Sequence, residues 1–443
     1  MPEGVGNAYA FQVFNTVSFT IVLGTPMILY FKKLGASATV LGIVLALPPL
    51  MNILQIPAAQ FVERIGYRAF VLRGWIMRSA FILGMVGVSM LPEKINAVTR
   101  IALLLFLLFA FNASRGISFC GFLPWITQWI PEEVRGRYIS RDQLSNSLAT
   151  LGTMIVSSFY LRSSEAQFTY ALLFLASFIT AIVSLWFLRR IPDVPVPVAP
   201  PSREKVPYKA MLIHPPFLKL LTYNVVLLGS LAGGSVFWIP LIRDSFGASD
   251  SLILGMTAIW SAVCAVCLWG FGHLVDRVGS RPVLGLATLT LVVHFCCWCS
   301  VAARLLTFNI WAIILVQSTA AIGLSLFNLA NTRLLMASVP PTGRSHFFAL
   351  YTVVVSLVSG VMPIFWGIAL DALAGWGGSW PHWQWNQYSL LYAAVVGIMI
   401  AALVLRNRLS EARAMTTDEF LRELLVSTPS RAISRFLTRR PLP

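Results

Sequence analysis

The sequence predicts an all-α membrane protein with 12 transmembrane helices, arranged as two pseudo-symmetric six-helix bundles. Charged residues make up only 11% of the 443 residues and hydrophobic residues 57%, and the mean hydropathy is +0.76. A soluble domain has about a quarter of its residues charged, so this chain lacks the charges that a water-exposed surface needs. The apolar residues also fall into long runs, and the two halves of the chain resemble each other. Lipid is therefore the expected solvent for most of the chain.

The apolar runs have the length of membrane spans. A helix needs roughly 20 apolar residues to cross a hydrocarbon core about 30 Å thick. Backbone groups inside lipid must be satisfied within the segment, so these runs are predicted to be helices. The twelve runs lie near 9–31, 39–61, 69–91, 98–121, 143–161, 167–188, 217–241, 252–274, 282–302, 308–332, 346–370 and 388–405.

The basic residues predict the orientation. The net charge is +16, but the basic residues lie between apolar runs rather than on one module, so we expect no nucleic-acid binding. Cytoplasmic loops carry the excess of Lys and Arg, which predicts a multi-pass plasma-membrane protein (a bacterial inner membrane) with both termini cytoplasmic. No cleavable signal is evident, and the first run is expected to be a retained span. The inner loops hold Arg64, Arg68, Arg135, Arg137, Arg141, Arg189, Arg190, Arg277, Arg281 and Arg344, and the outer loops hold Lys32, Lys33, Lys94, Arg100, Arg162, Arg243 and Arg304.

The predicted domain boundaries follow the interruptions in the apolar pattern. Residues 190–216 are rich in proline and charge, and they are predicted to be a cytoplasmic linker between an N-terminal bundle, 1–189, and a C-terminal bundle, 217–408. Residues 409–443 form a polar, basic tail with amphipathic stretches. This tail is expected either on the anionic inner leaflet or in the cytosol.

Two landmarks recur at similar offsets in the two halves. The run AQFVERIGYR at 59–68 follows the second span, and GHLVDRVGSR at 272–281 follows the eighth. PEEVR at 131–135 follows the fourth span, and PPTGR at 340–344 follows the tenth. Such a parallel repeat is typical of one large transporter fold.

On these motifs the chain resembles the major facilitator superfamily over all twelve spans. GHLVDRVGSRP is similar to the family loop G-x-x-x-D-R-x-G-R-[RK]. The first-half copy departs from that loop at Ala59, Glu63 and Tyr67. The resemblance implies a cytoplasmic gate, whereas the same charges could instead set topology and cap helices. The gate residues implied are Glu63, Arg64, Gly66, Arg68, Asp276, Arg277, Gly279, Arg281, Arg135 and Arg344.

The resemblance also implies a solute site near the membrane midplane, lined by spans 1, 4, 7 and 10. Ionisable residues inside spans are costly and are functional candidates. Arg115 lies about fifteen residues, or roughly 22 Å, along the fourth span from Arg100. A guanidinium there could bind a carboxylate or phosphate, or it could pair with backbone carbonyls. The predicted substrate-binding residues are Arg115, Asn112, Asn15, Asn224, Gln317 and Asn328, although each amide could serve helix packing instead.

Other ionisable groups in the spans are given structural roles. Arg73 and Arg78 are expected to snorkel toward the cytoplasm or pair with inner-loop acids, and His294 to be a satisfied buried histidine. No Asp or Glu lies near the middle of any span, so the sequence offers no buried carboxylate that could carry a proton across the membrane. Uniport, exchange, or coupling through Arg or His is favoured, and the coupling ion, H⁺ or an exchanged anion, is left open.

We expect no enzyme, because no GxSxG, HExxH or Walker motif is present. The six cysteines lie in apolar segments, so neither a metal site nor a cofactor is expected. The loop at 375–388 contains four Trp, which indicates an interfacial aromatic belt or a screen for sugars and aromatic solutes.

The predicted function is a secondary active or facilitative transporter that moves a small organic solute by rocker-switch alternating access. An anionic or polar metabolite is the favoured solute, and the predicted carrier is a monomer in the bilayer. Two alternatives remain open: efflux of amphipathic drugs by proton antiport, and a receptor or scaffold that keeps the fold without transport.

Overall fold

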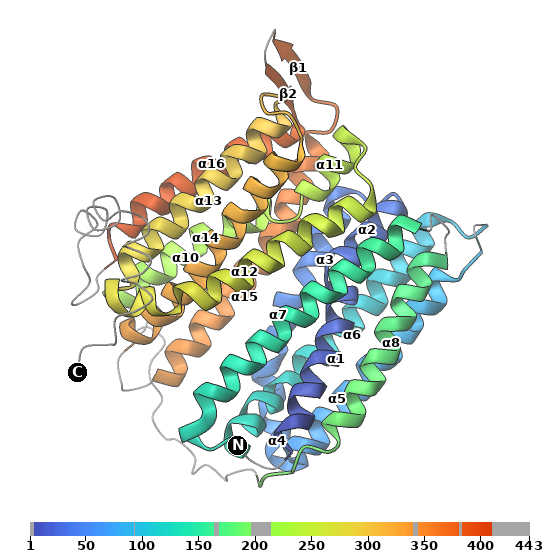
Figure 1. Ribbon diagram of the computed structural model, residues 1–443, viewed down its shortest axis with the longest axis vertical. Helices are drawn as coiled ribbons and strands as arrows, with labels where there is room; N and C mark the ends of the chain where they lie inside the picture. The colour runs from blue at the N-terminus through green and yellow to red at the C-terminus, as the bar shows by residue number, and fades with distance from the viewer. Residues whose placement is uncertain are drawn as a thin grey trace. The chain divides into compact units, whose positions relative to one another are not determined.

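The computed structural model describes residues 4–92, 94–163, 168–195, 214–339, 344–380 and 383–409, which form long helices and one hairpin (Figure 1). In the first half these are α1 (Val5–Leu23), α2 (Thr25–Lys33), α3 (Ala38–Met51), the 3₁₀ turn η1 (Asn52–Leu54), α4 (Gln55–Ile65), α5 (Tyr67–Ser89), α6 (Ala97–Trp129), α7 (Glu132–Ser163) and α8 (Phe168–Leu188). In the second half they are α10 (Pro215–Gly234), α11 (Trp238–Phe246), α12 (Asp250–Val278), α13 (Ser280–Ala302), α14 (Ile310–Ser338), α15 (Arg344–Ala372), β1 (Gly377–Trp380), β2 (Trp383–Asn386) and α16 (Gln387–Arg406).

Eleven helical stretches in the described part of the chain are long and apolar enough to cross a membrane. Three of them combine consecutive elements: α1 with α2, α3 with η1 and α4, and α10 with α11. The remaining long helix, α7, has 32 residues, and charges and amides fill its first half. Together these helices confirm the predicted all-α membrane fold.

Prolines and glycines determine where the spans are interrupted. The first span breaks at Gly24, where the backbone is extended, and Pro26 follows in the first turn of α2. In the second span, Pro48 and Pro49 cannot donate helical hydrogen bonds, and the helix tightens into η1 just beyond them. These breaks free backbone carbonyls inside the membrane, and a side chain must satisfy them.

The repeat found in the sequence is also present in the backbone. Gly66, between α4 and α5, has φ 85° and ψ 152°, and Gly279, between α12 and α13, has φ 95° and ψ 162°. Both are left-handed positions that glycine adopts without strain. Arg68 then donates to the Arg189 carbonyl past the end of α8, and Arg281 donates to the Asn407 carbonyl past the end of α16. The two loops therefore make equivalent turns and equivalent contacts.

The chain forms two compact units. Unit 1 holds the described residues within Met1–Ser202, Ser235–Ser261 and Ser356–Gly375, and unit 2 holds those within Arg203–Gly234, Ala262–Val355 and Trp376–Pro443. Unit 1 therefore combines the first six spans with α11, the start of α12 and the end of α15. The domain boundaries predicted at 189, 216 and 408 stay a prediction. The described residues of the predicted linker end at 195 and resume at 214, and the tail from 410 lies outside the described residues.

Each unit has an aromatic core. In unit 1, the buried Trp75 stacks near Phe122, and Phe11 packs against both rings. In unit 2, the buried Tyr392 stacks on Phe295 and Trp298 with ring centroids 6.2 and 6.3 Å apart. These rings hold the helices of each unit together by dispersion and apolar burial.

The tryptophan-rich segment near residue 380 is a β-hairpin rather than an irregular loop (Figure 1). Its strands pair antiparallel, with Gly377 opposite Asn386. The backbone N–H of Gln384 donates to the Ala303 carbonyl at 3.1 Å, and the side-chain amide of Asn386 donates to the Ala302 carbonyl at 2.6 Å. Because both contacts lie at the end of α13, the hairpin is fixed to unit 2.

Three glycines allow α3 to lie against α15 within unit 1. A Cβ added at Gly42 would stand 2.4 Å from the Pro363 carbonyl oxygen, and one at Gly367 would stand 2.5 Å from the Ala38 carbonyl oxygen. At Gly360 it would stand 2.3 Å from Cγ of Leu50. A methyl group at Gly42 or Gly367 cannot fit without moving a helix, because real Cβ atoms do not approach backbone oxygens so closely, whereas at Gly360 the Leu50 side chain would have to move.

This close approach yields a first prediction. Gly42→Ala is expected to destabilise this conformation by about 1–3 kcal/mol, because the added methyl overlaps backbone rather than a movable side chain. Gly87→Ala in α5 is the matched control, since an added Cβ there meets nothing within 4 Å. Thermal unfolding in detergent should show a lower Tm for Gly42→Ala and an unchanged or higher Tm for Gly87→Ala. Equal melting temperatures would refute the tight crossing.

Candidate functional site

Arg115 lies inside unit 1, against the interrupted second span. Gly116 permits this position, because a Cβ there would stand 2.0 Å from the Met51 carbonyl oxygen. The Arg115 Nη2 donates to the Pro48 carbonyl at 3.1 Å and to Oδ1 of Asn52 at 3.0 Å. The backbone N–H of Asn52 donates to the Leu50 carbonyl, so the Pro48 carbonyl remains available to accept from Arg115. Arg115 is thus held by neutral partners, and its Nε has none.

Arg78 also lies inside unit 1, and the expectation that it snorkels toward the cytoplasm or pairs with an inner-loop acid is wrong, because it is buried and bonds Asn15. It is the twelfth of the 23 residues of α5 and is fully buried. Its Nη2 donates to Oδ1 of Asn15 on α1. Its guanidinium carbon lies 4.4 Å from the ring centre of Phe19 and 4.2 Å from that of Trp75. By contrast, Arg73 is exposed, and its predicted snorkelling or pairing with an inner-loop acid stays a prediction.

The predicted amides of unit 1 have different environments. Asn15 is buried and engaged by Arg78, so it joins the arginine cluster. Asn112 is fully buried and donates to the Leu108 carbonyl of its own helix at 2.8 Å. Thr16, a residue that the sequence prediction missed, donates to Oδ1 of Asn146 on α7. We call Arg78, Arg115, Asn15 and Asn52 the arginine cluster.

Asn224 of unit 2 belongs to a closed hydrogen-bonded ring. Its Nδ2 donates to Oδ1 of Asn331 at 2.9 Å, Asn331 donates to the Tyr351 hydroxyl at 2.8 Å, and that hydroxyl donates to Oδ1 of Asn224 at 3.1 Å. Asn331 and Tyr351 were missed in the sequence, although Asn331 lies one turn beyond the predicted Asn328. The ring joins α10, α14 and α15.

The two other predicted residues of unit 2 lie apart from this ring in α14. Gln317 is buried, and its Nε2 has no hydrogen-bond partner among the described residues. Asn328 is exposed. His294 is buried with its Nδ1 2.9 Å from the Val316 carbonyl, as expected for a structural histidine.

The ring yields a second prediction. Asn224→Ala is expected to cost about 1–3 kcal/mol of stability, because it leaves buried polar groups of Asn331 and Tyr351 without their partner. Asn328→Ala is the matched control, since that side chain is exposed on the same group of helices. Comparison of the two Tm values tests this assignment, and a drop in Asn328→Ala alone would contradict it.

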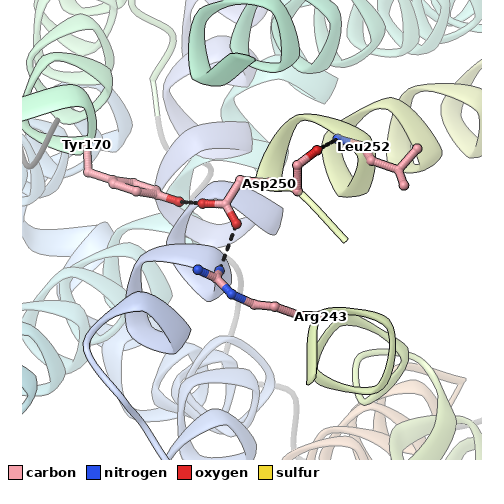
Figure 2. A network of polar contacts seen from close by, with 5 residues as sticks. Tyr170, Arg243, Asp250 and Leu252 are labelled. Atoms are coloured by element: carbon pink, nitrogen blue, oxygen red, sulfur yellow. Dashed lines mark hydrogen bonds and ion pairs between the residues drawn. The ribbon is translucent and has the colours of Figure 1, made fainter. Parts of the chain in front are cut away.

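A polar network joins the ends of several unit 1 helices (Figure 2). We call this the outer end, because the sequence predicts that these helix ends face the outside. The Tyr170 hydroxyl donates to Oδ2 of Asp250, and Nη1 of Arg243 lies 2.7 Å from Oδ1 of the same carboxylate. Lys32 and Asp244 form a second ion pair at 2.7 Å. These contacts connect α8 and α2 from the first half of the sequence with α11 and α12 from the second.

Asp371 completes the contacts of the outer end. Its carboxylate accepts hydrogen bonds from the Ala38 amide at 3.0 Å, the Thr39 amide at 2.8 Å and the Thr39 hydroxyl at 2.6 Å. Asp371 thereby caps the N-terminus of α3 from the last turn of α15, where free N–H groups and the helix dipole favour a negative charge.

The predicted gate residues are only partly described. Arg68 and Arg281 each bond a carbonyl at the end of a neighbouring helix within their own unit, and Gly66 and Gly279 form the turns. The side chains of Glu63, Asp276, Arg277, Arg135 and Arg344 lie outside the described residues. A gating role for these residues stays a prediction.

Comparison with known proteins agrees with this helical arrangement. A family model described as the Major Facilitator Superfamily matches residues 8–272 and 242–442, which together span nearly the whole chain. The chain belongs to the Major Facilitator Superfamily. A search of curated proteins gave no significant match.

Solved structures of other members of the superfamily show the same fold. A mutant of the nucleoside transporter NupG aligns with a TM-score of 0.72 at 9% identity, covering 92% of this chain and 99% of that one. The inward open conformation of the xylose transporter XylE from E. coli aligns at 0.64 with 16% identity, covering 94% and 97%. A bacterial homologue of the human lysosomal transporter Spinster, inward-facing and occupied, aligns at 0.66 with 16% identity, covering 91% and 95%. At these identities the likeness establishes the fold and leaves the solute open.

Proposed function

We propose that this superfamily member carries a small anionic organic solute across the membrane by alternating access, with Arg115 as a main contact for the anionic group. The observation that carries the proposal is the cationic arginine cluster inside membrane-spanning helices. Neither Arg78 nor Arg115 is paired with a carboxylate among the described residues, and a charge inside a membrane protein is costly unless it is compensated. An anionic solute supplies that compensation when it binds.

The orientation belongs to the same proposal. Both termini are placed in the cytoplasm of a plasma membrane, on the distribution of Lys and Arg. In this orientation Lys32, Arg243, Asp250 and Asp371 all lie at the outer end of unit 1. Their contacts link segments of both sequence halves, which supports a closed outer end. A carrier that alternates must break such contacts to admit solute from outside.

Two other functions predict different experimental results. Efflux of amphipathic cations or neutral drugs would not call for unpaired arginines inside the spans. A receptor or scaffold would bind its ligand without moving it. The superfamily includes nucleoside and xylose transporters with the same fold, but identities of 9–16% carry no substrate information.

The experiment is a thermal-shift screen of purified protein against anionic, neutral and cationic metabolites, followed by two variants. Anionic compounds should raise the Tm of the wild type. This stabilisation should disappear in Arg115→Ala and persist in part in Arg115→Lys, which keeps the charge. Arg73→Ala controls for loss of a basic residue, because Arg73 is exposed on α5. If only neutral or cationic compounds stabilise the protein, the anionic solute class is wrong.

A further inference from the structure

Arg78 is a buried cation whose hydrogen-bonding capacity is largely unused. Its Nε and Nη1 are buried without a hydrogen-bond partner, and its one side-chain acceptor is the neutral amide of Asn15. The rings of Phe19 and Trp75 lie over the guanidinium and offer cation–π attraction. That attraction is smaller than the cost of removing an unpaired ion from water.

The second arginine of the cluster adds to this penalty. The helices that carry the two arginines pack closely, because the Ser114 hydroxyl beside Arg115 donates to the Gly74 carbonyl, one turn from Arg78, at 3.0 Å. Phe19, which covers Arg78, also contacts Phe111, one turn before Arg115, with ring centroids 5.9 Å apart. The Nε of Arg115 is buried without a hydrogen-bond partner among the described residues. The described acids that form ion pairs, Asp244 and Asp250, are engaged with Lys32 and Arg243 at the outer end. Two positive charges are therefore carried by two packed helices inside unit 1, and their hydrogen-bond partners are neutral.

We propose that Arg78 and Arg115 together bind one dianionic group of the transported solute, either a phosphomonoester or a pair of carboxylates. This inference rests on the proposed function and narrows its solute class. A guanidinium presents fixed N–H donors that match carboxylate and phosphate oxygens, and two of them match two negative charges. Asn15 and Asn52 hold one Nη2 each, which orients both guanidinium groups while leaving other donors for the ligand.

Arg78 is fully buried in this conformation, so binding requires α1 to move away from α5. Asn15 and Phe19 are the α1 residues that cover the guanidinium. They lie at i and i+4 on that helix and therefore on one face. A small rotation or shift of α1 exposes the unused N–H donors of Arg78, and the dianion then takes the place of Asn15 and Phe19 beside the guanidinium.

The test compares ligands that differ by one charge. Titration calorimetry on the full-length wild type should show that succinate binds at least about tenfold more tightly than its half-amide, or glycerol 3-phosphate at least about tenfold more tightly than glycerate. The two series distinguish the dicarboxylate from the phosphomonoester. Arg78→Gln should weaken binding of the dianion at least about tenfold, to the affinity that the wild type shows for the monoanion. Arg115→Gln should weaken both.

A second variant keeps the arginine and so avoids loss of folding. Asn15→Asp places a carboxylate at the oxygen that Arg78 already contacts, so the charge is neutralised internally. This variant should raise the Tm of the ligand-free protein and abolish the preference for the dianion. Arg73→Gln is the control for net charge, and it should retain the preference.

The outcomes separate the two proposals. Equal binding of monoanion and dianion to the wild type, or an unchanged dianion preference in Arg78→Gln or Asn15→Asp, overturns the two-arginine site while the anion carrier stands. A dianion preference that is lost in both variants supports the site. If no anion binds the wild type at all, the proposed function and this inference both fall.

Discussion

Asp371→Ala is expected to open the outer end of unit 1. The carboxylate accepts three hydrogen bonds from Ala38 and Thr39 at the start of α3. Ser37 remains the N-cap of α3 in this variant, but the loss of part-buried hydrogen bonds to a charged group, together with the favourable charge at the helix dipole, costs about 1.5–3 kcal/mol. The balance between closed and open outer ends should therefore shift by roughly ten- to a hundredfold. Asp371→Asn, which keeps one acceptor oxygen, should shift it less.

The measurement is the rate at which a membrane-impermeant maleimide labels a cysteine at position 25, in a background without the six native cysteines. Thr25 is buried and contacts Thr257 at 3.1 Å, so a cysteine there reports opening of the outer end. Asp193→Ala is the control, because this exposed acid lies after α8 and bonds only the neighbouring amide of Val194 among the described residues. Labelling that does not accelerate in Asp371→Ala would show that the cap does not hold this end closed.

Asp250→Ala is expected to produce a large loss of stability, and Asp244→Ala a small one. Asp250 accepts from both Arg243 and Tyr170, and the side chains of the ion pair are 26% and 19% exposed (Figure 2). Removing this carboxylate leaves a partly buried arginine and a tyrosine hydroxyl without an acceptor, at a cost of about 2–3 kcal/mol. Asp244 is 42% exposed, and its pair with Lys32 should be worth less than about 1 kcal/mol.

Chemical or thermal unfolding of both variants in detergent measures the contrast. The double variant of Arg243→Ala with Asp250→Ala should lose less than the sum of the two single variants, because the residues act through one contact. Additive losses, or a larger effect in Asp244→Ala, would mean that the network shown in Figure 2 does not stabilise the outer end.

Composition and apolar run length were sufficient to predict the membrane fold. Lipid excludes charge from the spans, so the spans can be recognised in the sequence without knowledge of the tertiary structure. The helix α7 shows the limit of this prediction, since charges and amides fill its first half and it is not among the eleven described stretches that are long and apolar enough to cross a membrane. The hairpin at Gly377–Asn386 was missed because its pairing depends on anchoring to the end of α13, which no local pattern reports.

The arginine cluster was only half predicted. Arg115 stood out because it lies far along an apolar span. Arg78 was assigned to snorkelling on the assumption that its side chain was free to extend toward the interface. The contacts that hold it, Asn15 and Phe19, come from a helix about sixty positions away in sequence. Packing between helices that are distant in sequence determines how far the Arg78 side chain is buried, and a single sequence does not reveal that packing.

The amides show the same limit. Asn224 was predicted to bind solute, but its partners Asn331 and Tyr351 lie more than a hundred positions away and use its hydrogen-bonding groups. An amide in a span is equally compatible with helix packing and with ligand binding until its neighbours are known. Arginine is more informative than an amide, because a neutral neighbour satisfies an amide but does not neutralise a guanidinium.

Solute counterflow in proteoliposomes tests the central claim most directly, because it needs no knowledge of the coupling ion. Vesicles are preloaded with an unlabelled anion that stabilises the protein, and uptake of the labelled anion is followed from outside. The account predicts transient accumulation of label that requires the protein, saturates with solute and is lost in Arg115→Ala. Binding of the anion with no counterflow in the wild type would contradict a carrier and indicate a receptor with the same fold.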